Sequence, residues 1–239
     1  MSKLTFGLKA SYGLGQLSVG ALGLMTRICL FFFYSQVLGL PPLLAGLASA
    51  ISSVFDAITD PIIGSLSDNW RSKYGRRFPF LVIGTLPSAI CAFLLFTPLV
   101  EGEILLFIWF VTFSCLTNLF VTVFAIPHYA LGAELSDDYL ERASVVTYRQ
   151  FFYFFGQVII LFLAYGYFFA PNEEFANGQL NPAVYSPFVT VVALLYLLAS
   201  ISCIWKTKSV IPSLAEPVGD TNFSFEDSFK TIFTDIYEA

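Results

Sequence analysis

The chain has 239 residues, of which 56% are hydrophobic, 18% aromatic and only 12% charged, with a formal net charge of −5. Soluble domains contain about 25% charged residues, so this composition excludes an ordinary soluble protein and predicts an integral membrane protein. The apolar stretches leave almost no room for a separate soluble domain.

Six stretches are apolar over the roughly 17–25 residues that a helix needs to cross a bilayer. They are residues 8–38, 43–66, 80–100, 104–131, 146–170 and 187–205. We therefore predict an all-α membrane protein in which residues 1–209 form a six-helix transmembrane bundle. The composition changes after residue 209, so residues 210–239 are expected to form a cytoplasmic linker and an amphipathic helix.

The basic residues near the ends of the spans all fall on one side of the predicted membrane. They are Lys3, Lys9, Arg71, Lys73, Arg76, Arg77, Arg142, Lys206 and Lys208. The intervening loops, residues 39–42, 101–103 and 171–186, contain no Lys or Arg. The positive-inside rule then predicts a multi-pass protein of the cell (inner) membrane with both termini in the cytoplasm.

The second span carries Asp56 and Asp60, which one helical turn places on the same face. A charged carboxylate at the bilayer centre costs roughly 2.5–3.5 kcal/mol, and two like charges repel each other. A bound cation is the natural partner for this pair. The alternative is that the acids pair with the intramembrane arginines, Arg27 and Arg149.

Gly64 lies at the end of the second span and Asp68 one turn later, and Gly75, Arg76 and Arg77 lead into the third span. This arrangement resembles the cytoplasmic loop motif of the major facilitator superfamily. Gly64 would let a neighbouring helix approach, and Asp68 would pair with a helix N-terminus or an Arg to form a gate latch. Plain anchoring of the loop by the two arginines is the alternative.

The loop between the fourth and fifth spans is acidic and runs from Glu134 to Arg142. Its charges are expected to pair with Arg76 and Arg77 and so to set an inward gate. Exposed ion pairs are usually worth less than about 1 kcal/mol each, and a solvated loop without a gating role is the alternative.

Several separated motifs occur together, and they are Tyr12–Gly15, Phe33–Gly39, Phe55–Gly64 and Glu141–Arg149. In this order they resemble the glycoside–pentoside–hexuronide:cation symporters, the melibiose-carrier-like branch of the major facilitator superfamily. Members of that family have twelve spans in two halves, and this chain resembles the first half. The resemblance implies the amino-terminal half of a cation-coupled secondary symporter that carries a sugar or a related organic solute.

In that family two acids of the second span, the polar residue before the second acid and a Thr of the fourth span bind Na⁺, H⁺ or Li⁺. The corresponding residues here are Asp56, Thr59, Asp60 and Thr122. Carboxylate and hydroxyl oxygens suit a hard monovalent cation. We expect no metal beyond this coupling ion and no other cofactor.

The family also uses an Asp in the first span and another in the fourth to accept hydrogen bonds from sugar hydroxyls. Gly20 and Ala125 occupy these positions here, whereas the Arg of the fifth span is present as Arg149. The cargo is therefore expected only at the level of a small solute, a saccharide or a sugar acid.

Other polar residues at similar depth are candidates for solute binding, namely Arg27, His128, Tyr129 and Tyr148. Arg27 and Arg149 together would favour an anionic solute, because two guanidinium groups can hold a carboxylate. The alternative is that they neutralise the acid pair. His128 is either a proton shuttle or a hydrogen-bonding residue within the bundle.

We expect transport by alternating access between this half and a second half, which is either another six-helix unit or a second copy. One alternative is a truncated or split half that is inactive without its partner. Another is a non-transporting membrane sensor or assembly protein. Neither enzymatic activity nor a nucleic-acid partner is expected, because the sequence contains no catalytic constellation or nucleotide motif. Membrane lipid is the expected surrounding of the bundle.

Overall fold

The computed structural model describes residues 4–70, 72 and 74–208, and within them the regular secondary structure is helical. The long helices are α1 (Phe6–Phe32), α2 (Pro42–Asn69), α3 (Phe78–Leu95), α4 (Glu103–Glu134), α5 (Tyr139–Leu163) and α6 (Tyr185–Thr207). The π-helical segments η1 (Phe33–Val37) and η2 (Ala164–Phe168) extend α1 and α5, and the short 3-10 helices η3 (Gly178–Leu180) and η4 (Pro182–Val184) precede α6. Six helices of the described part are long and apolar enough to cross a membrane, which confirms the prediction.

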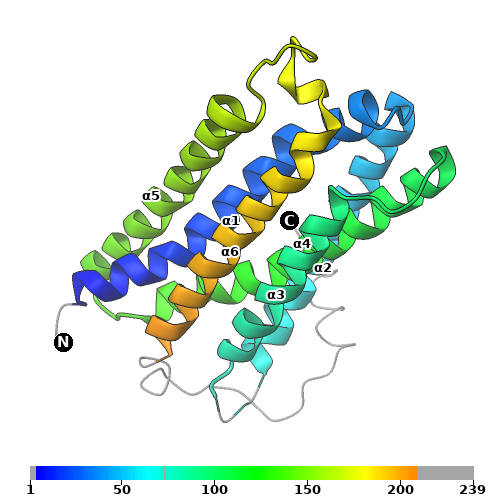
Figure 1. The fold of residues 1–239 in the computed structure, drawn as a ribbon. Coiled ribbons are helices and arrows are strands. Elements are labelled where there is room, and N and C mark those ends of the chain that lie inside the picture. The colour runs from blue at the N-terminus through cyan, green and yellow to red at the C-terminus, as the bar shows by residue number, and fades with distance from the viewer. Residues whose placement is uncertain (1–3, 71, 73, 209–239) are drawn as a thin grey trace.

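The helices form one bundle in which α1 lies between α5 and α6, and α4 lies against α2 and α3 (Figure 1). We call the end of the bundle that holds the first residues of α1 its N-terminal end. The first residues of α3 and α5 and the last residues of α2, α4 and α6 lie at this same end. The predicted linker and amphipathic helix of residues 210–239 fall outside the described residues.

Most helix boundaries lie within about three residues of the predicted ones, and two differ more. Helix α3 ends at Leu95 rather than at residue 100, because Pro98 follows and cannot donate the next helical hydrogen bond. Helix α5 begins at Tyr139 rather than at residue 146, because the Asp138 carboxylate caps it by accepting a hydrogen bond of 3.0 Å from the Glu141 amide. The first turns of α5 are therefore polar helix, which hydropathy alone does not detect.

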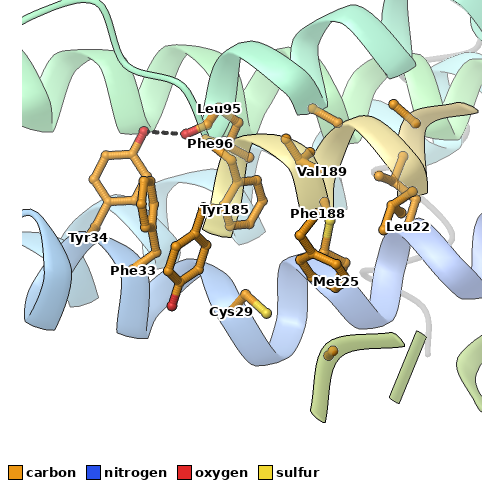
Figure 2. Packing of buried hydrophobic residues seen from close by; sticks show 14 of the residues in the cluster. Leu22, Met25, Cys29, Phe33, Tyr34, Leu95, Phe96, Tyr185, Phe188 and Val189 are labelled. Carbon is orange, nitrogen blue, oxygen red and sulfur yellow. Dashed lines mark hydrogen bonds between the residues drawn. The ribbon is translucent and has the colours of Figure 1, made fainter. Parts of the chain in front are cut away.

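An aromatic cluster closes the opposite end of the bundle (Figure 2). The Tyr34 hydroxyl donates a hydrogen bond of 2.7 Å to the carbonyl of Leu95, and the Tyr34 ring stacks on Phe110 with centroids 4.2 Å apart. Phe33 lies against Tyr185 with centroids 4.4 Å apart. These contacts join α1, α3, α4 and α6, and they satisfy the buried hydroxyl that the low-polarity interior would otherwise penalise.

Helices α1 and α5 pack backbone to backbone through glycines. A Cβ atom on Gly156 would overlap the carbonyl oxygen of Leu17, and one on Gly20 would overlap the carbonyl oxygen of Tyr153. Small residues allow this approach, and van der Waals contact then holds the helices together where lipid provides no hydrophobic drive. The α1–α5 interface is consequently rigid and leaves no space for a side chain at Gly20.

We predict that Gly156→Ala lowers the midpoint of thermal unfolding in detergent by at least about 3 °C, because the added methyl forces α5 away from α1. Gly23→Ala is the matched control, because no atom lies within 4 Å of a Cβ at this helical glycine. The control should be neutral or slightly stabilising, since alanine favours helix by up to about 1 kcal/mol. Equal effects of the two variants would contradict the proposed packing.

Candidate cation and solute site

The structure brings both acids of α2 to a hydroxyl of α4. Thr122 Oγ1 lies 2.8 Å from Asp60 Oδ1 and 3.4 Å from Asp56 Oδ1. Thr122 is only 7% exposed, and the two acids are half-buried. Three of the four residues predicted for the cation site therefore meet at the α2–α4 interface.

Thr59, the fourth predicted residue, directs its hydroxyl proton elsewhere. Its Oγ1 donates a hydrogen bond of 3.2 Å to the backbone carbonyl of Asp56, within α2 itself. This bond uses the hydroxyl proton and leaves the oxygen lone pairs available. The structure thus places Thr59 on the same segment of α2 as the acids, without a hydrogen bond to either carboxylate.

The polar contact between α2 and α4 continues one turn beyond the acid pair. Asn118 Nδ2 donates a hydrogen bond of 3.1 Å to Ser52 Oγ. These two residues were not predicted from the sequence, although Ser52 precedes Asp56 by four residues and Asn118 precedes Thr122 by four. That spacing puts each on the same helix face as the site, and it was the available signal.

Within the described residues no ion pair joins the acid pair to Arg27 or Arg149, so the alternative of neutralisation by these arginines is not observed. Arg149 lies with its Cζ atom 5.0 Å from the centre of the Tyr129 ring and interacts with the Tyr12 hydroxyl. Arg27 is exposed on α1, about 22 Å further along the helix than Tyr12 at 1.5 Å per residue. The prediction that both arginines hold one anion is therefore wrong for this half.

A polar cluster surrounds Tyr129 where α1, α4 and α5 meet. The Gln16 Nε2 atom donates a hydrogen bond of 3.2 Å to the Tyr129 hydroxyl, and Arg149 covers the ring of Tyr129. Gln16 was not predicted from the sequence, because its contact depends on which helix lies opposite. We call Gln16, Tyr129 and Arg149 the Gln16 cluster.

His128 lies inside the bundle rather than in a position to meet a solute. It is completely buried, its Nε2 lies 3.0 Å from the carbonyl oxygen of Tyr12, and the two rings stack with centroids 4.3 Å apart. The Tyr12 hydroxyl in turn donates to the His128 carbonyl at 3.0 Å. The carbonyl can only accept, so Nε2 carries the proton, and the structure favours the hydrogen-bonding role over the proton shuttle.

Tyr148 also lies apart from the Gln16 cluster. Its ring meets Phe6, in the first turn of α1, edge-on with centroids 5.9 Å apart. Of the predicted solute residues, Arg149 lies over the Tyr129 ring, and the buried His128 ring lies edge-on to Tyr129 with centroids 6.3 Å apart. Ala125, at the position of the family's second sugar acid, is a buried apolar residue.

An ion-pair cluster ties together α2, α3 and α4 at the N-terminal end. Arg77, the N-cap residue of α3, places Nη2 2.6 Å from Glu134 Oε1 and 3.1 Å from Asp68 Oδ1, and Arg76 bonds the same oxygen of Glu134. The predicted contacts of Asp68 and Glu134 with arginines are thus present. Gly64 does not act as predicted here, because a Cβ at this position would stand at an ordinary 3.7 Å from Ile126.

The remaining loop charges do not join this ion-pair cluster. Arg142 places Nη2 3.6 Å from Asp137 Oδ1 and donates from Nε to the Ser136 carbonyl at 2.5 Å, so it stays within its own loop. Glu141 pairs instead with Lys9 of α1 at 2.7 Å, a contact that the sequence did not suggest. Of the two loop residues proposed for the gate, Glu134 therefore contacts the basic loop and Arg142 does not.

The fold defines an integral multi-pass membrane protein with polar contacts between its spans. Residues 11–236 match the family described as MFS/sugar transport protein, and the chain belongs to this family. The resemblance inferred from the motifs is confirmed.

Three relatives illustrate the match. The uncharacterized symporter sll1374 of Synechocystis is 35% identical over 75% of this chain and 34% of its own length. The sodium-dependent lysophosphatidylcholine symporter 1-A of Danio rerio is 31% identical over 65% of this chain and 29% of its own length. The inner membrane symporter YicJ of Escherichia coli is 26% identical over 84% of this chain and 42% of its own length. The chain thus spans well under half the length of these relatives.

We predict that Glu134→Gln lowers the free energy of unfolding by about 2 kcal/mol or more, because it leaves Arg76 and the buried Arg77 without their shared carboxylate. Arg142→Gln should cost less than about 0.5 kcal/mol, since its pair with Asp137 is largely exposed. Unfolding by SDS in mixed micelles measures both. A loss at Arg142 as large as that at Glu134 would count against this assignment.

Proposed function

We propose that the chain is the amino-terminal half of a cation-coupled symporter and that Asp56, Asp60 and Thr122 hold the coupling ion between α2 and α4. The observation that carries the proposal is the single Thr122 hydroxyl within reach of both carboxylates. Thr59 is the fourth oxygen ligand in this proposal. Its hydroxyl proton is donated to a backbone carbonyl, so its oxygen lone pairs are available to a cation. The four residues are those that the motifs predicted.

The chemistry of the site favours a cation over an internal partner. A threonine hydroxyl has one proton and can satisfy only one of two neighbouring carboxylates fully. Within the described residues neither acid has an ion-pair partner, so their mutual repulsion and burial are relieved by a positive ligand. Carboxylate and hydroxyl oxygens are the ligands that a hard cation prefers, so we propose Na⁺ as the coupling ion.

Helix α4 connects the proposed cation site to the proposed solute site. Thr122 and Tyr129 lie about two turns apart on this helix, and Tyr129 contacts both α1 and α5 through Gln16 and Arg149. An ion that draws Thr122 toward α2 alters the position of Tyr129, so cation and solute each change the affinity for the other. The family description supports a sugar-like cargo, and the zebrafish relative adds a lysophospholipid as a possible chemical class.

The distribution of charge supports the proposed orientation. Lys9, Arg76 and Arg77 lie at the N-terminal end of the bundle, as does the Lys206–Lys208 segment, whereas the loops at the other end contain no Lys or Arg. The positive-inside rule then puts the N-terminal end in the cytoplasm. A second set of six helices, from the same gene, a separate chain or a second copy, would supply the other wall for alternating access.

We predict that Na⁺ raises the melting temperature of the purified chain at constant ionic strength, whereas choline does not. Asp56→Asn or Asp60→Asn should abolish this stabilisation, because each removes a charge that the ion neutralises. Thr122→Val should weaken the apparent Na⁺ affinity about tenfold, the effect of one lost bond to a charged group.

Thr190→Val is the matched control, since Thr190 bonds only its own helix, to the carbonyl of Ser186 on α6, and is exposed. It should leave the Na⁺ response unchanged. An unaltered Na⁺ response in the Asp56→Asn/Asp60→Asn double variant would contradict the cation-site proposal.

A further inference from the structure

Gln16 carries a buried oxygen that the protein leaves without a partner. The residue is 3% exposed, and its Nε2 atom donates to the Tyr129 hydroxyl at 3.2 Å. Its Oε1 atom is inaccessible and has no hydrogen-bond partner. Buried polar atoms are nearly always hydrogen-bonded, so an orphaned acceptor beside a proposed transport site requires an explanation.

The surroundings of this oxygen can receive a polar ligand. Tyr129, which accepts the Gln16 hydrogen bond, is 39% exposed, and Arg149 lies over the Tyr129 ring. Within the described residues Arg149 forms no ion pair with a carboxylate. A hydrogen-bond acceptor, an aromatic ring and a positive charge therefore meet where α1, α4 and α5 converge.

The neighbouring positions offer no competing acceptor. Gly20, one turn beyond Gln16 on α1, lies against the α5 backbone at Tyr153, and Ala125, one turn before Tyr129 on α4, is apolar. The reciprocal hydrogen bonds between Tyr12 and His128 fix α1 against α4 beside the cluster. Gln16 is 3% exposed and Tyr129 is 39% exposed, so we expect Tyr129 rather than Gln16 to change position when a ligand binds.

We propose that Gln16 is a solute-binding residue and that Tyr129 is its movable cover. When Tyr129 rotates away, a solute oxygen replaces its hydroxyl as the acceptor for Gln16 Nε2, Gln16 Oε1 accepts a hydrogen bond from a hydroxyl of the solute, and Arg149 binds an adjacent anionic oxygen. The ligand chemistry is thus a hydroxyl beside an anionic group, found in hydroxy acids and in the glycerophosphate of a lysophospholipid. This assignment deepens the proposed symporter function and rests on it for the transport step.

An amide suits this place better than a carboxylate would. A carboxylate at residue 16 would pair with Arg149 and cancel the charge that attracts an anion. The neutral glutamine accepts a hydroxyl hydrogen without competing for the guanidinium. Ligand binding also gives the orphaned oxygen a partner, so part of the affinity comes from relieving an unfavourable feature of the empty site.

The test measures binding to the purified chain in nanodiscs containing Na⁺, with two pairs of probes. D-glucuronate is compared with glucose, and lysophosphatidylcholine with its analogue lacking the sn-2 hydroxyl. The wild-type chain should bind the hydroxylated anion of at least one pair about tenfold more tightly than its partner probe. Glucuronate binding alone would identify a soluble hydroxy acid as the cargo class, and lysophosphatidylcholine binding alone would identify a lipid headgroup.

Gln16→Met keeps the side-chain volume and removes the acceptor. It should weaken binding of the hydroxylated anion about tenfold, leave the deoxy analogue unchanged, and not lower the melting temperature of the ligand-free chain. Gln16→Glu should also weaken anion binding, because the new carboxylate pairs with Arg149, and Arg149→Gln should abolish the preference for glucuronate over glucose. Gln36→Met, at an exposed position of η1, should behave as wild type.

Wild-type affinity in Gln16→Met, or no saturable binding of any probe by the wild-type chain, would overturn the assignment. The Na⁺ response of each variant is measured in the same samples. Loss of Gln16 dependence with an intact Na⁺ response removes the solute assignment alone. An Na⁺ response that survives Asp56→Asn, together with Gln16-dependent binding, removes the cation site alone.

Discussion

Two carboxylates on one turn of α2 share a single hydroxyl of α4. The placement of α2 against α4 follows from the need of these carboxylates for a polar partner. Lipid cannot solvate Asp56 and Asp60, so α2 must turn this face toward a polar surface. Helix α4 supplies it with Thr122 and, one turn earlier, with Asn118 opposite Ser52. The same register brings the ends of α2 and α4 together, where Asp68 and Glu134 both reach Arg77 at the start of α3.

Two interfaces of the half-bundle, α1–α5 and α2–α4, differ in how they can move. Glycines put the backbones of α1 and α5 in direct contact, so any sliding would cause collisions between main-chain atoms. The α2–α4 interface instead consists of side-chain hydrogen bonds around a charged pair, which can rearrange when an ion binds. Helix α4 also contacts α1 through the Tyr12–His128 pair, so it joins the adjustable interface to the rigid one.

The sequence predicted the features that depend on one helix alone. It did not predict the contacts that depend on which helix lies opposite. Six spans and the acid pair followed from apolar length and four-residue spacing, and Thr122 followed from the family motif. Gln16 could not be found in this way, because its orphaned oxygen arises only where α1, α4 and α5 meet. Arg27 and Arg149 both lie in apolar stretches, so both were expected within the membrane. Helical periodicity predicts the face on which a residue lies, but not which residues of a neighbouring helix it contacts. The early start of α5 could not be predicted from hydropathy, because its N-cap residue, Asp138, is polar.

The half-bundle keeps its opposite charges apart. Asp56 and Asp60 lie on α2 and Arg149 on α5, and within the described residues none of them is in an ion pair, although pairing would be the least costly arrangement in a bilayer. A protein that only needed to be stable would have little reason to maintain both charges unpaired. Their separation is explained if each is matched by a ligand of the opposite sign, a cation at the acids and an anionic group at the arginine. A monovalent cation would offset one of the two carboxylate charges, and an anionic group would offset the charge of Arg149, so each ligand lowers the electrostatic cost of its own site. Because α4 contacts both sites, a cation that rearranges α4 around the acids would change the affinity at Arg149, and such a coupling of affinities is the thermodynamic requirement for symport.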